Sequence, residues 1–157
     1  MTGLAMNDVA DATSRDPVLE ALLVHRHPMM MLSRALAVDV PGEASAVADV
    51  SRESIFYDPL LGGVPPEAAI EFMAQTMALA VGADSARRGE KPRPGYLLGT
   101  RRLSPSIAFF DPDREYVVTA KCVYSDDEFA SFDCAIALDG EEVARATLTA
   151  CRENADK

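Results

Sequence analysis

Residues 66–82, with the sequence PEAAIEFMAQTMALAVG, constrain the fold more than any other part of the chain. Pro65 and Pro66 suit the entry to a helix, because their missing N–H groups are not needed there. Gly82 lies where a glycine commonly follows the end of a helix, so the pattern predicts a helix that ends at this residue. Almost every residue between is apolar. A helix without a polar face is expected to be buried on all sides.

The length and charge of the chain exclude several classes of protein. With 157 residues it fits a single domain that has its own core. A formal net charge of −10 argues against a nucleic-acid or membrane-surface partner. The apolar helix is too short and too acidic to span a bilayer, and the N-terminus lacks the basic start and apolar segment of a signal peptide. We therefore expect a cytoplasmic protein.

The domain boundaries follow from composition. Residues 1–16 are small and polar and are expected to form a disordered arm, residues 17–152 the single domain, and residues 153–157 a C-terminal tail. The three cysteines, Cys122, Cys134 and Cys151, are far apart, form no CxxC pair and lie in strand-like runs. We expect no metal site, disulfide or cofactor.

Alternating apolar and polar residues predict about six strands, and Asp16 followed by Pro17 predicts the N-cap of a short helix over 17–23. Asp139-Gly140 is a strong hairpin signal between the last two strands. An antiparallel sheet curled around the one apolar helix buries that helix on all sides. The predicted fold is therefore the α+β hotdog architecture. The expected strands cover residues 34–40, 44–51, 96–110, 115–124, 129–138 and 142–151.

Two carboxylates interrupt the apolar helix. Glu67 is explained by the positive end of the helix dipole. Glu71 lies one turn further in, with Gln75 four residues later on the same face. A carboxylate at such a position needs partners or a cavity to face. Glu71 is therefore either a partly exposed side chain at a dimer seam or an acid in an apolar pocket, where Gln75 would help to bind substrate.

The helix segment IEFMAQ, residues 70–75, resembles the VEAMAQ core of the β-hydroxyacyl-acyl-carrier-protein dehydratases. Residues 25–34, HRHPMMMLSR, and the closing hairpin DGEEVARA, residues 139–146, also resemble motifs of that family. With RPGYLLGTRR at 93–102, the sequence is most similar to a subgroup from bacterial aryl-polyene pigment biosynthesis. The resemblance implies a hotdog homodimer that removes water from a 3-hydroxyacyl thioester of an acyl carrier protein.

In the family, a carboxylate on the core helix and a histidine on the preceding loop share the proton transfers, and they come from opposite subunits. The carboxylate corresponds to Glu71, but Tyr57 stands where the loop histidine would be. The family glycine whose N–H binds the thioester carbonyl is replaced by Pro66, which has no N–H. The N–H groups of Glu67 and Ala68 are candidates to replace it.

The missing loop histidine leaves the proton partner of Glu71 open. His25 or His27 could take over as the base, or His25 could have the structural role of its counterpart in the family. Tyr57 could donate a proton or a hydrogen bond, although a phenol with a pKa near 10 is a poor base at neutral pH. Tyr57 could equally pack at the mouth of a substrate tunnel.

An acidic carrier protein would be repelled by a chain of net charge −10 unless basic residues gather where it docks. Six cations and one carboxylate lie between residues 87 and 102, and we expect docking there through Arg87, Arg88, Arg101 and Arg102. The same residues could simply form a solvated connector.

Three functions remain open from sequence. The first is an active dehydratase with a relocated partner for Glu71. The second is a non-catalytic hotdog subunit that binds acyl groups or pairs with an active dehydratase, in which case the dimer would be a heterodimer. The third is an acyl thioesterase, in which a helix carboxylate activates water.

Overall fold

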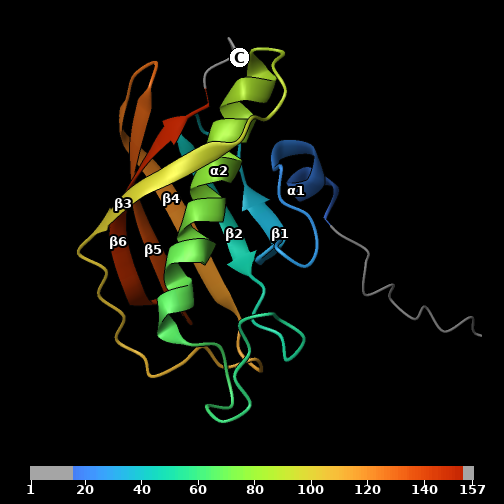
Figure 1. Ribbon diagram of the computed structural model, residues 1–157, viewed down its shortest axis with the longest axis vertical. Coiled ribbons are helices and arrows are strands. Elements are labelled where there is room, and N and C mark those ends of the chain that lie inside the picture. The colour runs from blue at the N-terminus through green and yellow to red at the C-terminus, as the bar shows by residue number, and fades with distance from the viewer. Residues whose placement is uncertain (1–15, 154–157) are drawn as a thin grey trace, which may run out of the picture.

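The computed structural model describes residues 16–153 and has one helix-containing layer and one sheet (Figure 1). The helices are α1 (Pro17–Leu22), a 3-10 turn (Pro66–Ala68) and α2 (Ala69–Arg87). The strands are β1 (Leu32–Ala37), β2 (Glu43–Ala48), β3 (Gly95–Arg101), β4 (Tyr116–Ser125), β5 (Phe129–Leu138) and β6 (Glu141–Arg152). All pairings are antiparallel, in the order β1-β2-β4-β5-β6-β3.

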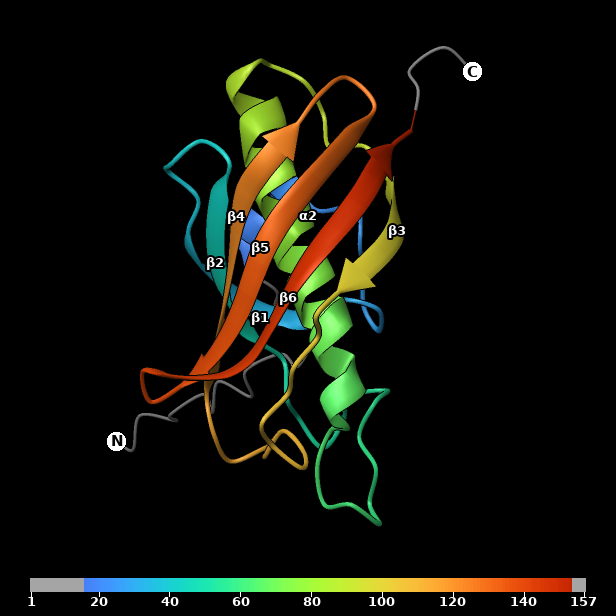
Figure 2. The same ribbon diagram turned by 90° about the vertical axis from the view of Figure 1, so that its left-hand side faces the viewer.

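The sheet curls around α2, as the apolar helix predicts. In Figure 1, β3 crosses in front of α2 while β2 and β4 lie behind it, and Figure 2, viewed from the left-hand side of Figure 1, shows β4, β5 and β6 in front of the helix. Phe72, Met73 and Leu79 on the helix are fully buried, and Phe110 packs edge-on between Phe72 and Tyr116. The six-stranded α+β hotdog fold predicted from sequence is confirmed.

Helix α1 and strands β4, β5 and β6 lie within one residue of their predicted bounds, whereas β1 and β2 each end three residues earlier than predicted. Asp16 caps α1 by accepting a hydrogen bond from the Val18 N–H at 2.8 Å, and its second oxygen accepts the Ala35 N–H at 2.8 Å, which ties α1 to β1. Asp139 and Gly140 both have positive φ in the β5–β6 turn, as this tight hairpin requires. The predicted arm, apart from Asp16, and the tail, apart from Glu153, lie outside the described residues.

One strand prediction was wrong. The run 96–110 forms a strand only as far as Arg101, because Arg102 takes a left-handed φ of 58° and turns the chain out of the regular strand. Beyond it, the N–H groups of Ser104 and Ser106 bind carbonyls of β6, and Phe110 forms an isolated bridge with Val64. Pro105 has no N–H to donate, which also prevents a continuous ladder.

The predicted end of the core helix was also wrong, for a packing reason. α2 continues through Gly82 to Arg87, and Gly89, with φ +73°, follows its end. A Cβ atom built on Gly82 would lie 2.1 Å from the Leu22 carbonyl oxygen. Glycine is required at position 82 because the end of α1, at Leu22, lies against the helix backbone there, not because the helix stops.

We predict that Gly82→Ala destabilises the protein by about 1–3 kcal/mol, because the new methyl group must push the backbone at Leu22 away from α2. Alanine is intrinsically the better helix former, so a loss of stability is diagnostic of the close contact. Urea unfolding would measure it. Gly99→Ala, which has open space around its Cβ, is the control. Equal stabilities of the wild type and Gly82→Ala would contradict this account of the packing.

Candidate active site

Glu71 lies in the first turn of α2, directly after the 3-10 turn. The residue is half-buried, and it lines a cavity of about 850 Å³. One carboxylate oxygen, Oε1, accepts a hydrogen bond from Gln75 Nε2 at 2.7 Å. Within residues 16–153 the other oxygen, Oε2, has no hydrogen-bond partner. The carboxylate is thus held on one side and free on the side that a ligand could use.

Gln75 holds Glu71 in place and is itself completely buried. Its amide oxygen accepts the Met31 N–H at 2.8 Å, and its amide nitrogen donates to the Met29 carbonyl at 2.8 Å as well as to Glu71. Gln75 does not line the cavity. The structure therefore places its amide among groups of the chain itself, where sequence analysis expected it to contact substrate.

His25 lines the same cavity as Glu71. It is half-buried, and its Nδ1 atom is buried without a hydrogen-bond partner among the described residues. Burial lowers the pKa of His25, Glu71 raises it to a lesser extent, and Arg26 lowers it. The net direction favours the neutral imidazole, which can accept a proton at neutral pH.

The cavity runs along one face of α2 from Glu71 to Arg88. From the helical rise per residue, this stretch of the helix is about 25 Å long. The helix contributes mainly small side chains to it, and Leu97 of β3 and Leu22 at the end of α1 line the other sides. Ala74, Ala78 and Val81 are only half-buried, although most of the other apolar side chains of the helix are buried. This strip of α2 can accept an extended apolar group whose far end meets Arg88, Glu90 and Arg93.

The other residues proposed from sequence lie elsewhere. Tyr57, Glu67 and Ala68 do not line this cavity. Tyr57 is half-buried in the loop before the 3-10 turn, and its N–H donates to the Ser54 carbonyl at 3.0 Å. The Ala68 N–H donates to the Pro65 carbonyl at 3.1 Å, so it is not available as a carbonyl donor in this arrangement. His27 is exposed.

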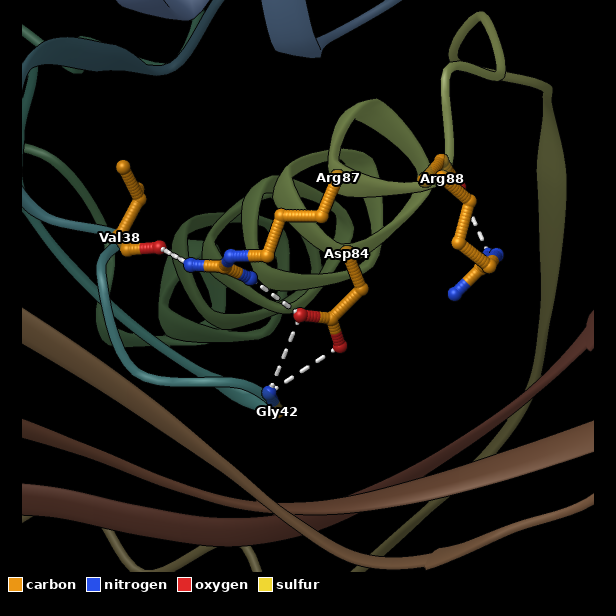
Figure 3. Close-up of polar contacts among 6 residues, drawn as sticks. Val38, Gly42, Asp84, Arg87 and Arg88 are labelled. Atoms are coloured by element: carbon orange, nitrogen blue, oxygen red, sulfur yellow. Dashed lines mark hydrogen bonds and ion pairs between the residues drawn. The ribbon is translucent and has the colours of Figure 1, made fainter.

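The four arginines proposed for docking fall into two pairs. Arg87 bonds to Asp84 at 2.6 Å and to the Val38 carbonyl, and Asp84 also accepts the Gly42 N–H (Figure 3). This cluster fastens the end of α2 to the turn between β1 and β2. Arg88 is paired with Glu90 at 3.3 Å. Arg101 and Arg102 are exposed at the end of β3, away from that cluster.

Sequence analysis missed the groove along α2. Its signal was present in the sequence, because Ala74, Ala78, Val81 and Ser85 follow Glu71 at helical spacings of three and four residues. These positions were interpreted as part of an apolar helix buried on all sides. Sequence analysis also missed the cluster of hydrogen bonds around Asp84, because this cluster depends on how the turn between β1 and β2 contacts the end of the helix.

A sequence model of the ApeP-like dehydratases matches residues 17–157. The chain belongs to this family. The match confirms the resemblance to hotdog dehydratases of the aryl-polyene subgroup. Curated protein sequences give no match to the chain.

One solved structure supports the same assignment, and two others share its fold. The dehydratase heterocomplex ApeI:P from Xenorhabdus doucetiae contains a chain that is 26% identical, with a TM-score of 0.81 over 87% of this chain and 91% of that one. A hypothetical thioesterase with coenzyme A from Streptococcus pneumoniae is 18% identical, with a TM-score of 0.56 over 73% and 80% of the two chains. The phenylacetic acid degradation protein PaaI from Thermus thermophilus is 22% identical, with a TM-score of 0.57 over 88% and 100%. The last two likenesses show the shared fold alone.

Two further properties bear on the expected partners and cofactors. In residues 16–153 no helix is both long and apolar enough to cross a membrane. The same part of the chain holds no cluster of three histidine, cysteine or acidic side chains that could bind a metal ion.

We predict that His25 makes the stability of the protein depend on pH. Its pKa is lower in the folded than in the unfolded chain, so the unfolded chain binds a proton at a higher pH than the folded chain does. The contribution of His25 to stability is therefore fully present above the unfolded pKa of about 6.5 and is lost as the pH falls through the folded pKa. The melting temperature should therefore decrease less between pH 7 and pH 5 in His25→Gln than in the wild type. His27→Gln is the matched control. Parallel pH profiles for the wild type and His25→Gln would contradict the prediction.

Proposed function

We propose that this protein removes water from 3-hydroxyacyl thioesters of an acyl carrier protein, in a fatty-acid or polyene-type pathway of the cytoplasm. The observation that carries the proposal is the common cavity of Glu71 and His25, because a carboxyl group and a neutral imidazole are the proton-transfer groups this reaction needs. Membership in the ApeP-like dehydratase family supports it independently.

In the proposed reaction, His25 accepts the proton from the carbon next to the thioester carbonyl. The electron pair of that C–H bond forms the new double bond, and the C–O bond to the hydroxyl group breaks. Glu71 donates a proton to the departing hydroxyl, which leaves as water. The proton on His25 then returns to Glu71, so that both groups are restored. The acyl tail would lie along Ala74, Ala78 and Val81, where α2 lines the cavity.

The thioester carbonyl gains negative charge during proton abstraction and needs a hydrogen-bond donor. Pro66 has no N–H, and the Ala68 N–H is bonded to Pro65. Glu67 lies outside the cavity, so we propose its N–H as the donor for a thioester that extends past Glu71 toward the 3-10 turn that leads into α2. Removing one such donor typically costs about 10²–10³ in rate, so a single remaining donor would make a slow enzyme.

The second candidate function is a subunit that completes its site with a hotdog partner. Tyr57 stands in place of the loop histidine, and β3 is an edge strand with exposed Tyr96, Leu97 and Leu98. An exposed apolar edge strand invites pairing with another chain. We propose that the protein is a homodimer or, as in the ApeI:P heterocomplex, a pair of different chains. In the paired form, a residue of the partner subunit would replace His25 as the base that accepts the substrate proton, and Glu71 would remain the acid.

The third candidate, thioester hydrolysis, is favoured only by a fold shared with thioesterases. Its product would be a free acid. The experiment below distinguishes it from dehydration.

We predict that Glu71→Gln lowers the rate of dehydration by about 10² or more, because an amide cannot supply the proton that the leaving hydroxyl needs. The substrate is a short 3-hydroxyacyl carrier protein, and mass spectrometry detects either the loss of one water or the release of the acid. The protein is assayed alone and with a hotdog dehydratase as partner. Glu53→Gln, which changes an exposed carboxylate outside the cavity, is the control.

Two results would decide between the candidates. Dehydration that requires the partner and is insensitive to His25→Gln would favour the composite site over the self-contained one. Full activity of Glu71→Gln in both assays would contradict the proposal.

A further inference from the structure

One wall of the cavity is a single short stretch of chain, residues 22–25, which ends at His25. The beginning of this stretch is fixed to α2, because the Leu22 carbonyl oxygen lies where a Cβ atom on Gly82 would come within 2.1 Å of it. Leu23 is buried in the core. His25 is only half-buried, so its place in the cavity wall depends on what holds the chain after Leu23.

The side chain of Arg26 holds the other end of this stretch. Its guanidinium donates to three backbone carbonyls, from Nη1 to Leu23 at 2.8 Å and to His25 at 2.7 Å, and from Nη2 to Glu20 at 3.0 Å. Glu20 belongs to α1, so the guanidinium lies over the C-terminal end of that helix, where carbonyls have no partner within the helix. Because the carbonyls on both sides of Val24 are bonded to one rigid group, the backbone that carries His25 has little freedom to turn.

The main chain of Arg26 is held as well. Its carbonyl accepts the Met29 N–H at 2.8 Å. The Met29 carbonyl in turn accepts a hydrogen bond from Gln75 Nε2, the same atom that donates to Glu71. Arg26 therefore connects the segment that carries His25 to the amide that orients Glu71. Since Arg26 does not line the cavity, it can influence the chemistry there only through these neighbours.

Arg26 also affects the charge of His25. Burial is the main cause of the lowered pKa of His25, while Glu71 on α2 raises it and the positive charge of Arg26 lowers it further. A cation beside an imidazole disfavours the imidazolium, so Arg26 helps to keep His25 neutral. The other charged side chains of the cavity wall belong to its far end and are Arg88, Glu90, Arg93, Asp127, Arg152 and Glu153.

We propose that Arg26 is a positioning residue for the dehydration, because its guanidinium fixes the backbone of residues 23–25 and so holds the His25 imidazole at the cavity that Glu71 lines. The proposal rests on the function proposed above, in which His25 accepts the substrate proton. The chemistry suits arginine, whose planar fork of N–H groups can bond to three carbonyls at once. A lysine ammonium is a compact point charge on a flexible chain and would not hold them in the same fixed arrangement.

The first test measures the pKa of His25. The chain has two histidines, so in a His27→Gln background the imidazole signals in an NMR titration belong to His25 alone. The amide of Arg26→Gln is shorter and uncharged, and we expect the pKa of His25 to rise in it toward the unperturbed value of about 6.5. Arg34→Gln removes another exposed arginine, on β1, and is the matched control that should leave this pKa unchanged.

The second test measures dehydration in the same variants. Misplacement of the base should lower kcat of Arg26→Gln by about 10-fold to 10²-fold. The acidic limb of its kcat/KM profile should move to higher pH together with the pKa from NMR, because only a neutral imidazole accepts the proton. Arg26→Lys keeps the positive charge without the planar fork. In that variant the pKa of His25 should lie between those of the wild type and Arg26→Gln, while kcat falls as in Arg26→Gln.

An unchanged pKa of His25 and an unchanged acidic limb in Arg26→Gln, with only a lower melting temperature, would overturn the proposal, because Arg26 would then merely cap α1. Full kcat in both Arg26 variants, together with a slow His25→Gln, would overturn it as well. Dehydration that is insensitive to His25→Gln would instead count against the proposed role of His25. The NMR titration would still decide whether Arg26 holds the imidazole.

Discussion

The structure depends on enclosing a 19-residue helix that has almost no polar face. The curled sheet covers most of α2, and the end of α1 covers another part by approaching so closely that only glycine fits at position 82. These two layers do not meet over the whole helix. The strip they leave, from Glu71 past Ala78 to Arg88, is the wall of the cavity. The same constraint that produces the fold therefore produces the groove.

One buried amide connects the fold to the chemistry. Gln75 is a buried residue of α2, and its side-chain amide is hydrogen-bonded to the Met29 carbonyl, the Met31 N–H and the Glu71 carboxylate. The segment it holds also carries His25, a few residues earlier, to the same cavity. A buried amide that lost these partners would be costly, so the hydrogen bonds fix both the approach of the segment and the orientation of Glu71. Glu71 and His25 are thus brought to one cavity by contacts that also stabilise the core.

Much of this was predictable from local pattern. Apolar composition identified the helix, alternation identified the sheet, and Asp139-Gly140 identified the closing hairpin, because each depends on nearby residues. Features that depend on distant segments were not predictable in this way. Gly82 has the sequence signature of a helix end but serves a tertiary contact, and Arg87 belongs to a basic cluster in sequence but is bonded to Asp84 in the structure. The role of Gln75 likewise depends on a segment 44 residues away.

The central claim is that the uncovered strip of α2 binds the acyl group with its hydroxyl at Glu71. The most direct measurement is a crystal structure of the protein, with its subunit partner if one is required, bound to a 3-hydroxyacyl pantetheine amide that cannot be hydrolysed. The claim predicts the hydroxyl within hydrogen-bond distance of Glu71 and the acyl tail beside Ala74, Ala78 and Val81. An acyl group bound away from α2, or a tail that leaves this strip empty, would contradict it.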